Sequence, residues 1–222
     1  MMDKPLMDWS LTFRLLAHEI RAPIAVISGY TRMLREGRLD GADRSRALEQ
    51  IESAAARLAQ YGRQSSDLGR WLQGLDGSRQ PIAAEDLVTR AVELVTFDEA
   101  RLERKADGLG GLHVPCSDGE AVSAALASLM EAAAREAAAE PVRVLVRRGS
   151  EAFEFFAGPA AAARWNDPLQ GPEHGEAPGI DRGGMGLAFV LAAAVVQAHG
   201  GQIWSMGGRQ GLIALRLPAR QG

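Results

Sequence analysis

One histidine, His18, is the residue best placed to do chemistry. It lies in residues 15–24, which read Leu-Leu-Ala-His-Glu-Ile-Arg-Ala-Pro-Ile. Apolar residues recur around it at spacings of three and four, which predicts a helix. They are Leu16, Ile20, Ile24, Ile27, Tyr30 and Leu34. At about 100° per residue, His18 lies roughly 200° round the helix from its apolar neighbours. The imidazole is therefore expected to point toward solvent or a partner protein.

Two charged residues beside His18 suit it to nucleophilic chemistry. Glu19 follows directly and offers a carboxylate that can orient the ring or accept its proton. Arg21 lies one turn further on and offers a guanidinium suited to phosphate. These are the groups of a nucleophilic histidine. The alternative is an ordinary polar pair on a solvated helix face, with Pro23 either bending the helix or marking its end.

Length and composition exclude several classes of protein. The chain has 222 residues, of which 46% are hydrophobic, enough for one domain or two small ones. A net charge of -3 with dispersed basic residues argues against a nucleic-acid partner. No apolar run approaches the roughly 20 residues that span a bilayer, and no signal peptide is evident. We therefore expect a cytoplasmic protein with no membrane association.

The remaining histidines and the cysteine give no metal site. His113, His174 and His199 lack metal-ligand spacing with a third group. They are interpreted as loop or helix-end residues, and His199 as one favoured by the helix dipole. Cys116 is the only cysteine, which excludes an intramolecular disulfide and a cysteine metal cluster.

Residues 1–74 are predicted to form a helical hairpin. The first helix is expected from about residue 9 to residue 36, with a turn at residues 37–41. A second apolar seam alternates spacings of four and three, and consists of Ala47, Ile51, Ala54, Leu58, Tyr61, Ser65, Leu68 and Leu72. One hairpin cannot cover both stripes, so a homodimeric four-helix bundle is the prediction. The alternative is a monomeric hairpin that lies on the rest of the chain.

Residues 82–222 follow a turn-rich break at residues 74–81 and predict a second domain of the α+β class. Helices are expected to pack on one face of a mixed sheet. The predicted helices are 84–94, 118–138 and 185–199, the second capped by Ser117 or Asp118. The predicted strands are 142–147, 151–156, 202–205 and 212–217, with a loop beside a short strand at 109–115 and a long loop over 158–182.

The run His-Glu-Ile-Arg-Ala-Pro-Ile at residues 18–24 resembles the H box of the sensor histidine kinases. In that family the histidine is phosphorylated on the dimerisation helix and passes the phosphoryl group to a receiver-domain aspartate. Residues 182–190 and 197–204 resemble the second glycine box and the helix and strand after it. The resemblance implies a dimerisation and phosphoacceptor hairpin followed by an α/β sandwich of the histidine-kinase ATPase (Bergerat) type.

The family's nucleotide-binding residues are partly replaced. The resemblance places Ala132 where an asparagine holds magnesium, and a methyl group cannot ligate Mg²⁺. Phe156 stands where an aspartate hydrogen-bonds the adenine amino group, and Ala160 replaces a glycine of the same box. Glu131 is interpreted as a solvated helix residue. The degenerate nucleotide site consists of Ala132, Phe156, Gly158, Gly184 and Gly186. We expect no ATP, no Mg²⁺ and no other metal to be bound.

These departures narrow the resemblance to kinase-fold histidine phosphotransferases. His18 is then the residue that exchanges a phosphoryl group with receiver-domain aspartates, while Glu19 assists its proton balance and Arg21 holds the phosphoryl oxygens. The expected partners are response-regulator receiver domains, including that of a hybrid histidine kinase, and they bring their own Mg²⁺. Ala22 stands where kinases with phosphatase activity carry Thr or Asn, so transfer is expected in preference to phosphatase activity.

Two alternatives stay open. One is an active but divergent histidine kinase that uses the second glycine box. The other is a pseudokinase module that binds and regulates a kinase or response regulator. The sequence also leaves open a different small ligand in the altered cleft, beside Phe156 and Trp165.

Overall fold

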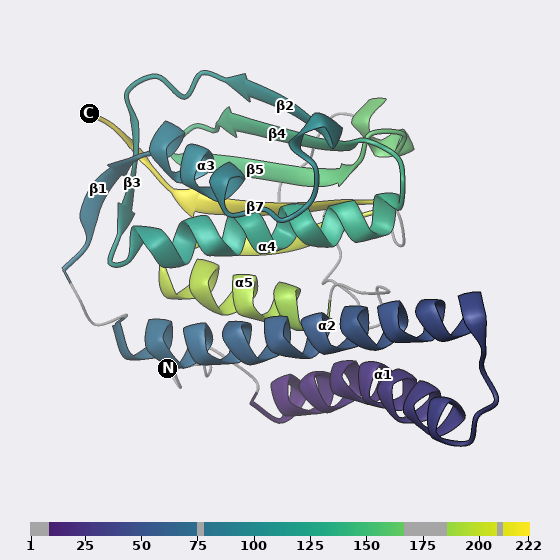
Figure 1. The fold of residues 1–222 in the computed structure, drawn as a ribbon. Helices are drawn as coiled ribbons and strands as arrows, with labels where there is room; N and C mark the ends of the chain where they lie inside the picture. Colours follow the sequence, from purple (N-terminus) through teal and green to yellow (C-terminus); the bar gives the residue numbers. More distant parts are fainter. Residues whose placement is uncertain (1–8, 75–77, 167–185, 208–210) are drawn as a thin grey trace. The chain divides into compact units, whose positions relative to one another are not determined.

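The computed structural model describes residues 9–74, 78–166, 186–207 and 211–222 (Figure 1). The chain divides into two compact units, Asp8–Gly69 and Arg70–Gly222. We call the first the hairpin and the second the sandwich. The division falls within the second helix, slightly before the predicted boundary at residue 74.

The hairpin consists of α1 (Trp9–Arg35) and α2 (Gly41–Gly74). Gly37 ends α1 in the left-handed region, with φ +66°, where a side chain would be strained. The α2 helix begins where the Asp40 carbonyl accepts hydrogen bonds from the amides of Asp43 and Arg44. Both helices predicted from the spacing of apolar residues are present, and α2 begins before its first seam residue.

The face that α1 turns toward α2 differs slightly from the prediction. Leu16, Ile20 and the later seam residues are half-buried, and on α2 Ala47 and Ala54 are buried. Ile24, however, is 48% exposed, while Pro23 is buried in its place. Neighbouring residues lie about 100° apart round a helix, so Pro23 faces α2 more directly than Ile24 does. Ile24, predicted on the apolar face of a bundle helix, is therefore not covered by α2 within one hairpin.

The sandwich is built on a five-stranded mixed sheet in the order β2-β4-β5-β7-β6. The strands are β2 (Leu102–Asp107), β4 (Val142–Arg148), β5 (Ala152–Pro159), β6 (Gln202–Met206) and β7 (Leu212–Pro218). Only β2 and β4 pair in parallel, and the other neighbours are antiparallel. A small second sheet has the order β1-β3-β8 and consists of β1 (Gln80–Ala83), β3 (Leu112–Cys116) and β8 (Arg220–Gln221).

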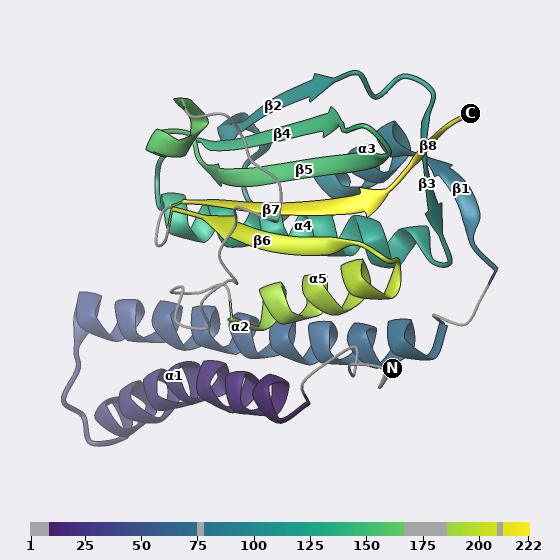
Figure 2. The same ribbon diagram turned by 180° about the vertical axis from the view of Figure 1, so that it is seen from behind.

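Three helices lie on one face of the larger sheet (Figures 1 and 2). They are α3 (Ala84–Glu93), α4 (Gly119–Ala137) and α5 (Gly186–Ala198). Twelve residues of α4 are buried, and most are alanine, so neighbouring elements approach it closely. The core lies between these helices and the sheet. The predicted α+β class, a helical hairpin followed by helices on one face of a mixed sheet, is confirmed.

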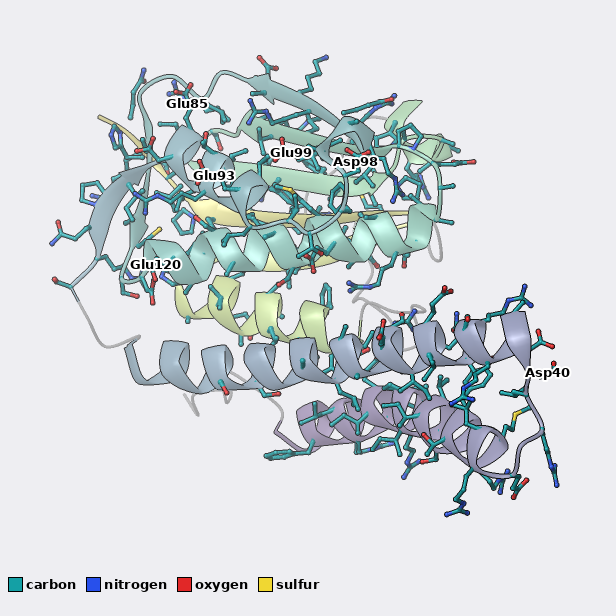
Figure 3. The ribbon with its side chains drawn as sticks, viewed as in Figure 1. Asp40, Glu85, Glu93, Asp98, Glu99 and Glu120 are labelled. Carbon is teal, nitrogen blue, oxygen red and sulfur yellow. The ribbon has the colours of Figure 1, made fainter. Side chains whose placement is uncertain are left out.

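Several of the acidic side chains labelled in Figure 3 lie at the starts of helices. Glu85 and Glu120 lie in the first turns of α3 and α4. Asp98 caps the short 3-10 helix η1 (Glu99–Arg101) by accepting a hydrogen bond from the Ala100 amide. The positive end of a helix dipole favours negative charge at these positions. Asp118 caps α4 by the same kind of bond, as one of the two predicted caps.

Three strands were absent from the predicted elements, β1, β2 and the short β8. Five of the six β2 residues are exposed, and the strand lies at the edge of the sheet, so its sequence Leu-Glu-Arg-Lys-Ala-Asp has no apolar alternation. The β1 strand lies partly in the turn-rich break and contains Pro81, which lowers strand propensity. Among the described helices, none is long and apolar enough to cross a membrane.

Candidate functional site

His18 lies in the middle of α1 and its side chain is exposed. Arg21 lies one turn further along and is also exposed. Three residues correspond to about 300° round the helix, so the two side chains leave the helix within about 60° of each other. The structure therefore presents an imidazole and a guanidinium together on one accessible face, as the spacing predicts.

Glu19 differs from these two neighbours because it faces α2. It is half-buried, and the Tyr61 hydroxyl on α2 donates a hydrogen bond to its Oε2 atom, with 2.8 Å between the two oxygens. Ser65 in turn donates from Oγ to the Tyr61 carbonyl oxygen at 2.8 Å. The carboxylate beside the candidate nucleophile is thus fixed by the second helix of the hairpin.

The site predicted from the sequence consists of His18, Glu19 and Arg21, and it does not include the contact between Tyr61 and Glu19. Tyr61 is predicted there only as a seam residue, packed by its ring. A partly buried tyrosine hydroxyl usually finds a hydrogen-bond partner, and this is the signal that could have pointed to the contact. The partner's identity could not be obtained from spacing, because 42 residues separate the two.

Ala132 is fully buried in the core on α4. Its methyl group offers no oxygen to a magnesium ion. The preceding Glu131 is half-buried, and its Oε1 atom accepts hydrogen bonds from the amide and the hydroxyl of Thr96, at 3.2 and 2.9 Å. Glu131 therefore ties the chain after α3 to α4, and its interpretation as merely solvated is wrong.

Phe156 lies on β5 with its side chain on the sheet face opposite the helices. It packs there in a cluster with Trp204, Met206, Leu212 and Ala214, against which Leu145, Ala162 and Trp165 also pack. The rings of Phe156 and Trp204 meet edge to face, with centroids 6.1 Å apart. Its neighbours Phe155 and Ala157 belong to the core on the helix side. Phe156 and Trp165 thus fill a small core, and the ligand pocket considered for them is not formed by these two side chains.

The glycines of the degenerate site have different settings. Gly158 on β5 is buried, and a Cβ there would lie 2.8 Å from Leu212 Cδ2 and 2.9 Å from the Gly211 carbonyl oxygen. This glycine is therefore required by close strand packing. Gly186 is the first residue of α5. Gly184 and His174 lie outside the described residues.

A cavity of about 850 Å³ lies at the end of β5 and α4. Its charged lining residues are Glu136, Glu140 and Arg164, beside Pro159, Gly207 and Gly211. Two carboxylates against one guanidinium give no excess of positive charge for a polyphosphate. Among the described residues, no group of three His, Cys, Asp or Glu side chains is placed to hold a metal ion.

A buried carboxylate lies on the same outer sheet face as Phe156. Glu154 is 3% exposed and accepts hydrogen bonds from Arg147 (2.7 Å) and Arg216 (2.9 and 2.6 Å). Burial raises the pKa of Glu154, but the hydrogen bonds and charges of the two arginines outweigh it and hold the pKa below its ordinary value of 4.5. Arg147 also lies over the Phe156 ring, 5.0 Å from its centroid. This network serves the packing of the sheet.

His199 is at the end of α5, as predicted, but it is completely buried. Its Nδ1 atom lies 2.8 Å from the Val195 carbonyl oxygen, and its Nε2 atom accepts a hydrogen bond of 3.3 Å from the Ser117 amide. Burial lowers the pKa of His199 below 6.5, and the positive charge of Arg79 acts in the same direction. The interpretation of His199 as a residue stabilised by the helix dipole is therefore wrong, because that effect needs the charged ring.

Comparison with known proteins supports the assignment of the hairpin. Residues 9–74 match the family model described as the His Kinase A (phospho-acceptor) domain. The chain resembles the catalytic module of a sensor histidine kinase. No curated protein matches the chain.

Solved histidine kinases share this fold. The histidine kinase AdeS of Acinetobacter baumannii is 18% identical, with a TM-score of 0.54 over 90% of this chain and 97% of that one. The histidine kinase ThkA, solved in complex with the response regulator protein TrrA, is 18% identical with a TM-score of 0.59. That match covers 95% of this chain and 61% of the ThkA chain. Full-length ShkA in complex with AMPPNP is 18% identical with a TM-score of 0.52, over 97% of this chain and 47% of that one.

The histidine-kinase-like hairpin places His18 within the matched phosphoacceptor segment. At these identities the likeness to solved kinases shows the fold, and the chemistry has to be argued from the side chains of this chain. Those side chains include an exposed histidine in the hairpin, and a buried alanine and a buried phenylalanine at positions 132 and 156 of the sandwich.

Proposed function

We propose that this chain is a histidine phosphotransfer protein of a two-component phosphorelay. His18 accepts a phosphoryl group from one receiver-domain aspartate and donates it to another, and the chain does not use ATP. The observation that carries the proposal is a contrast within one chain. An exposed histidine lies in a matched phosphoacceptor hairpin, while the sandwich has Ala132 and Phe156 where the sequence resemblance expects the magnesium and adenine contacts.

Phosphoryl transfer from ATP depends on neutralising the phosphates and holding them in line. Ala132 supplies no ligand atom, and it lies in a packed core that also contains Ala192, Val195 and Val196 of α5. Phe156 supplies no acceptor for an adenine amino group, and its ring lies on the face away from the helices. An adenine in the family's position would lose a hydrogen bond with nothing in exchange.

Transfer from a phosphorylated receiver domain needs no nucleotide-binding site on this chain. A ring nitrogen of neutral His18 attacks the phosphorus with its lone pair, and the bond from phosphorus to the receiver's aspartate oxygen breaks. The electron pair of that bond returns to the receiver's carboxylate. The Mg²⁺ that neutralises the phosphoryl oxygens belongs to the receiver's acidic pocket. The guanidinium of Arg21, exposed near His18, stabilises the same oxygens.

The proposed partners are response-regulator receiver domains. ThkA, which has the same fold as this chain, was solved in complex with a response regulator, and that complex is the precedent for such a partner. On this chain, His18, Arg21 and Ala22 are all exposed on α1, so a receiver can approach the ring. Because Ala22 has no group to orient a water molecule, transfer is favoured over hydrolysis of the receiver's phosphate.

We also propose that the hairpin pairs with a second copy. Phe13 and Ile24 are 63% and 48% exposed, and eleven residues on a helix correspond to about 20° of rotation, so they share one face of α1. Replacing Ile24 by Asp should shift the chain toward monomer in analytical ultracentrifugation. His18→Ala is the matched control and should keep the dimer. A monomeric wild-type chain would contradict the proposal.

The test of transfer uses a receiver domain labelled on its aspartate with ³²P. Incubation with the chain should move label to His18, and His18→Ala should receive none. Arg21→Ala should slow the transfer by about tenfold, the usual scale for loss of one charged hydrogen bond. Label on the His18→Ala chain, or none on the wild type with any receiver encoded beside it, would refute the assignment.

The main alternative is an active histidine kinase, favoured by the fold shared with kinases such as ShkA, which was solved with AMPPNP. Incubation with labelled ATP and Mg²⁺ distinguishes the two. We expect no label on His18 and no heat of binding in a calorimetric titration with ATP. If the chain instead binds a kinase or receiver without carrying phosphate, His18→Ala should retain full biological activity.

A further inference from the structure

The hydrogen bond between Tyr61 and Glu19 joins the two helices of the hairpin directly beside His18. Its oxygen-to-oxygen distance is 2.8 Å, in the ordinary range for a hydroxyl that donates to a carboxylate. Glu19 is half-buried, whereas His18 and Arg21 on either side of it are exposed. Among the three charged or nucleophilic residues of the site, Glu19 is thus the one that α2 holds.

We infer that Tyr61 is a positioning residue for the phosphoacceptor site, because its hydroxyl holds the Glu19 carboxylate where it can accept the ring proton of His18. This inference rests on the proposed role of His18 as the residue that is phosphorylated. A carboxylate has two oxygens, so a bond from Tyr61 to Oε2 leaves Oε1 able to accept a second hydrogen bond. A free glutamate side chain would be spread over many rotamers, and the bond to Tyr61 selects one region of them.

The chemistry explains why a fixed carboxylate helps. When one ring nitrogen of His18 attacks phosphorus, the ring carries the phosphoryl group on that nitrogen and a hydrogen on the other. The ring is cationic until this hydrogen leaves as a proton to Glu19 or to water. A carboxylate on the next residue, already confined by Tyr61, has fewer side-chain conformations to lose when it turns one oxygen to the developing cation. Tyr61 makes no contact with the phosphoryl group in this scheme and acts through Glu19.

The surroundings of Tyr61 on α2 bear on what the loss of its hydroxyl would do. Ser65 Oγ donates to the Tyr61 carbonyl oxygen at 2.8 Å, one turn further along α2. Tyr61 is half-buried and lies on the same seam of α2 as the buried Ala54. The ring is therefore partly covered at the seam between the two helices, and removal of the hydroxyl alone should leave the packing intact.

The experiment measures how fast His18 is phosphorylated by phosphoramidate, a small phosphodonor that needs no receiver domain. The full-length chain is compared with Tyr61→Phe, Glu19→Ala and the double variant. We expect Tyr61→Phe to slow phosphorylation threefold to tenfold and to have less than a twofold effect when Glu19 is already Ala. Tyr30→Phe, the same chemical change at the other tyrosine, is the control and should react at the wild-type rate.

Three outcomes overturn the inference. They are an unchanged rate in Tyr61→Phe, the same slowing in the Glu19→Ala background, and a loss of helicity by circular dichroism that accounts for the slowing. A wild-type chain that does not react at His18 overturns both the inference and the proposed function. If the chain reacts with phosphoramidate in the expected pattern but takes no label from receivers, the proposed function fails and the inference stands.

Discussion

Acidification should destabilise the sandwich through His199. The ring is fully buried, its Nδ1 atom faces the Val195 carbonyl oxygen, and its Nε2 atom accepts from the Ser117 amide. Protonation of Nε2 would place a hydrogen against the amide that now donates to it. The pKa of the folded state is therefore below the value of 6.5 that applies to the unfolded chain, chiefly because burial disfavours the charged ring.

The sign and the size of the change in the free energy of unfolding follow from proton linkage. Above pH 6.5 the ring is neutral in both the folded and the unfolded state, so protonation of His199 takes nothing from the free energy of unfolding. Below that pH the unfolded chain binds a proton that the folded chain does not, and stability is lost until the pH passes the folded pKa. Each pH unit in this window costs at most about 1.4 kcal/mol, so a fall from about pH 6.5 to about pH 5 costs up to about 2 kcal/mol. In a domain of this size that corresponds to a fall in Tm of roughly 4 to 8 °C.

Urea denaturation at several pH values measures this effect. Replacing His199 by Gln removes the titrating ring but keeps a donor and an acceptor, so its stability should change less between about pH 6.5 and pH 5. His113→Gln, at a partly exposed histidine, is the control and should keep the wild-type slope. If His199→Gln has the same slope as the wild type, the buried neutral ring is not the cause.

Three further predictions concern stability. Ala138 has φ +54° and ψ -108°, a conformation that favours glycine. Ala138→Gly should therefore raise the free energy of unfolding by about 1 kcal/mol, measured by urea denaturation. An unchanged midpoint would argue against backbone strain at this residue. Glu154→Gln should cost about 2 kcal/mol, less than for a fully buried pair because both arginines reach solvent. Below about pH 4.5 the wild type should lose more stability than this variant, because protonation of Glu154 breaks the network only in the wild type, and equal acid sensitivity would count against the network. Asp118→Ala should cost about 1 kcal/mol through loss of the α4 cap, a result that an unchanged thermal midpoint would contradict.

Elements with a clear apolar period were predictable from the sequence. The seams of α1 and α2 and the alternation in β4 follow directly from side-chain spacing. The β2 strand could not be found in this way, because an edge strand pairs through its backbone and here exposes almost all its side chains. Its pairing with β4 involves residues about 40 positions away. Such a partner is a property of the fold and leaves no local pattern.

The candidate site was likewise predictable only in part. The exposure of His18 follows from its angle to the apolar seam, and Ala132 and Phe156 follow from the resemblance. The orientation of Phe156 does not, because β5 is buried on both faces and its alternation shows only that Phe155 and Phe156 face opposite ways. The bond from Tyr61 to Glu19 and that from Ser117 to His199 join residues 42 and 82 positions apart, and neither has a local signature.

The replacement at position 132 affects packing as well as chemistry. Ala132 is fully buried in one core cluster with Ala133 on α4 and with Ala192, Val195 and Val196 on α5. An asparagine there would have to bury an amide among methyl groups, at a cost of about 1 to 3 kcal/mol if no partner were found. An asparagine at this position would therefore need a hydrogen-bond partner or a local rearrangement of the packing round α4. Under the proposed function, a chain with this closed core would receive its phosphoryl group from another protein, and the exposed ring of His18 is where that protein would deliver it.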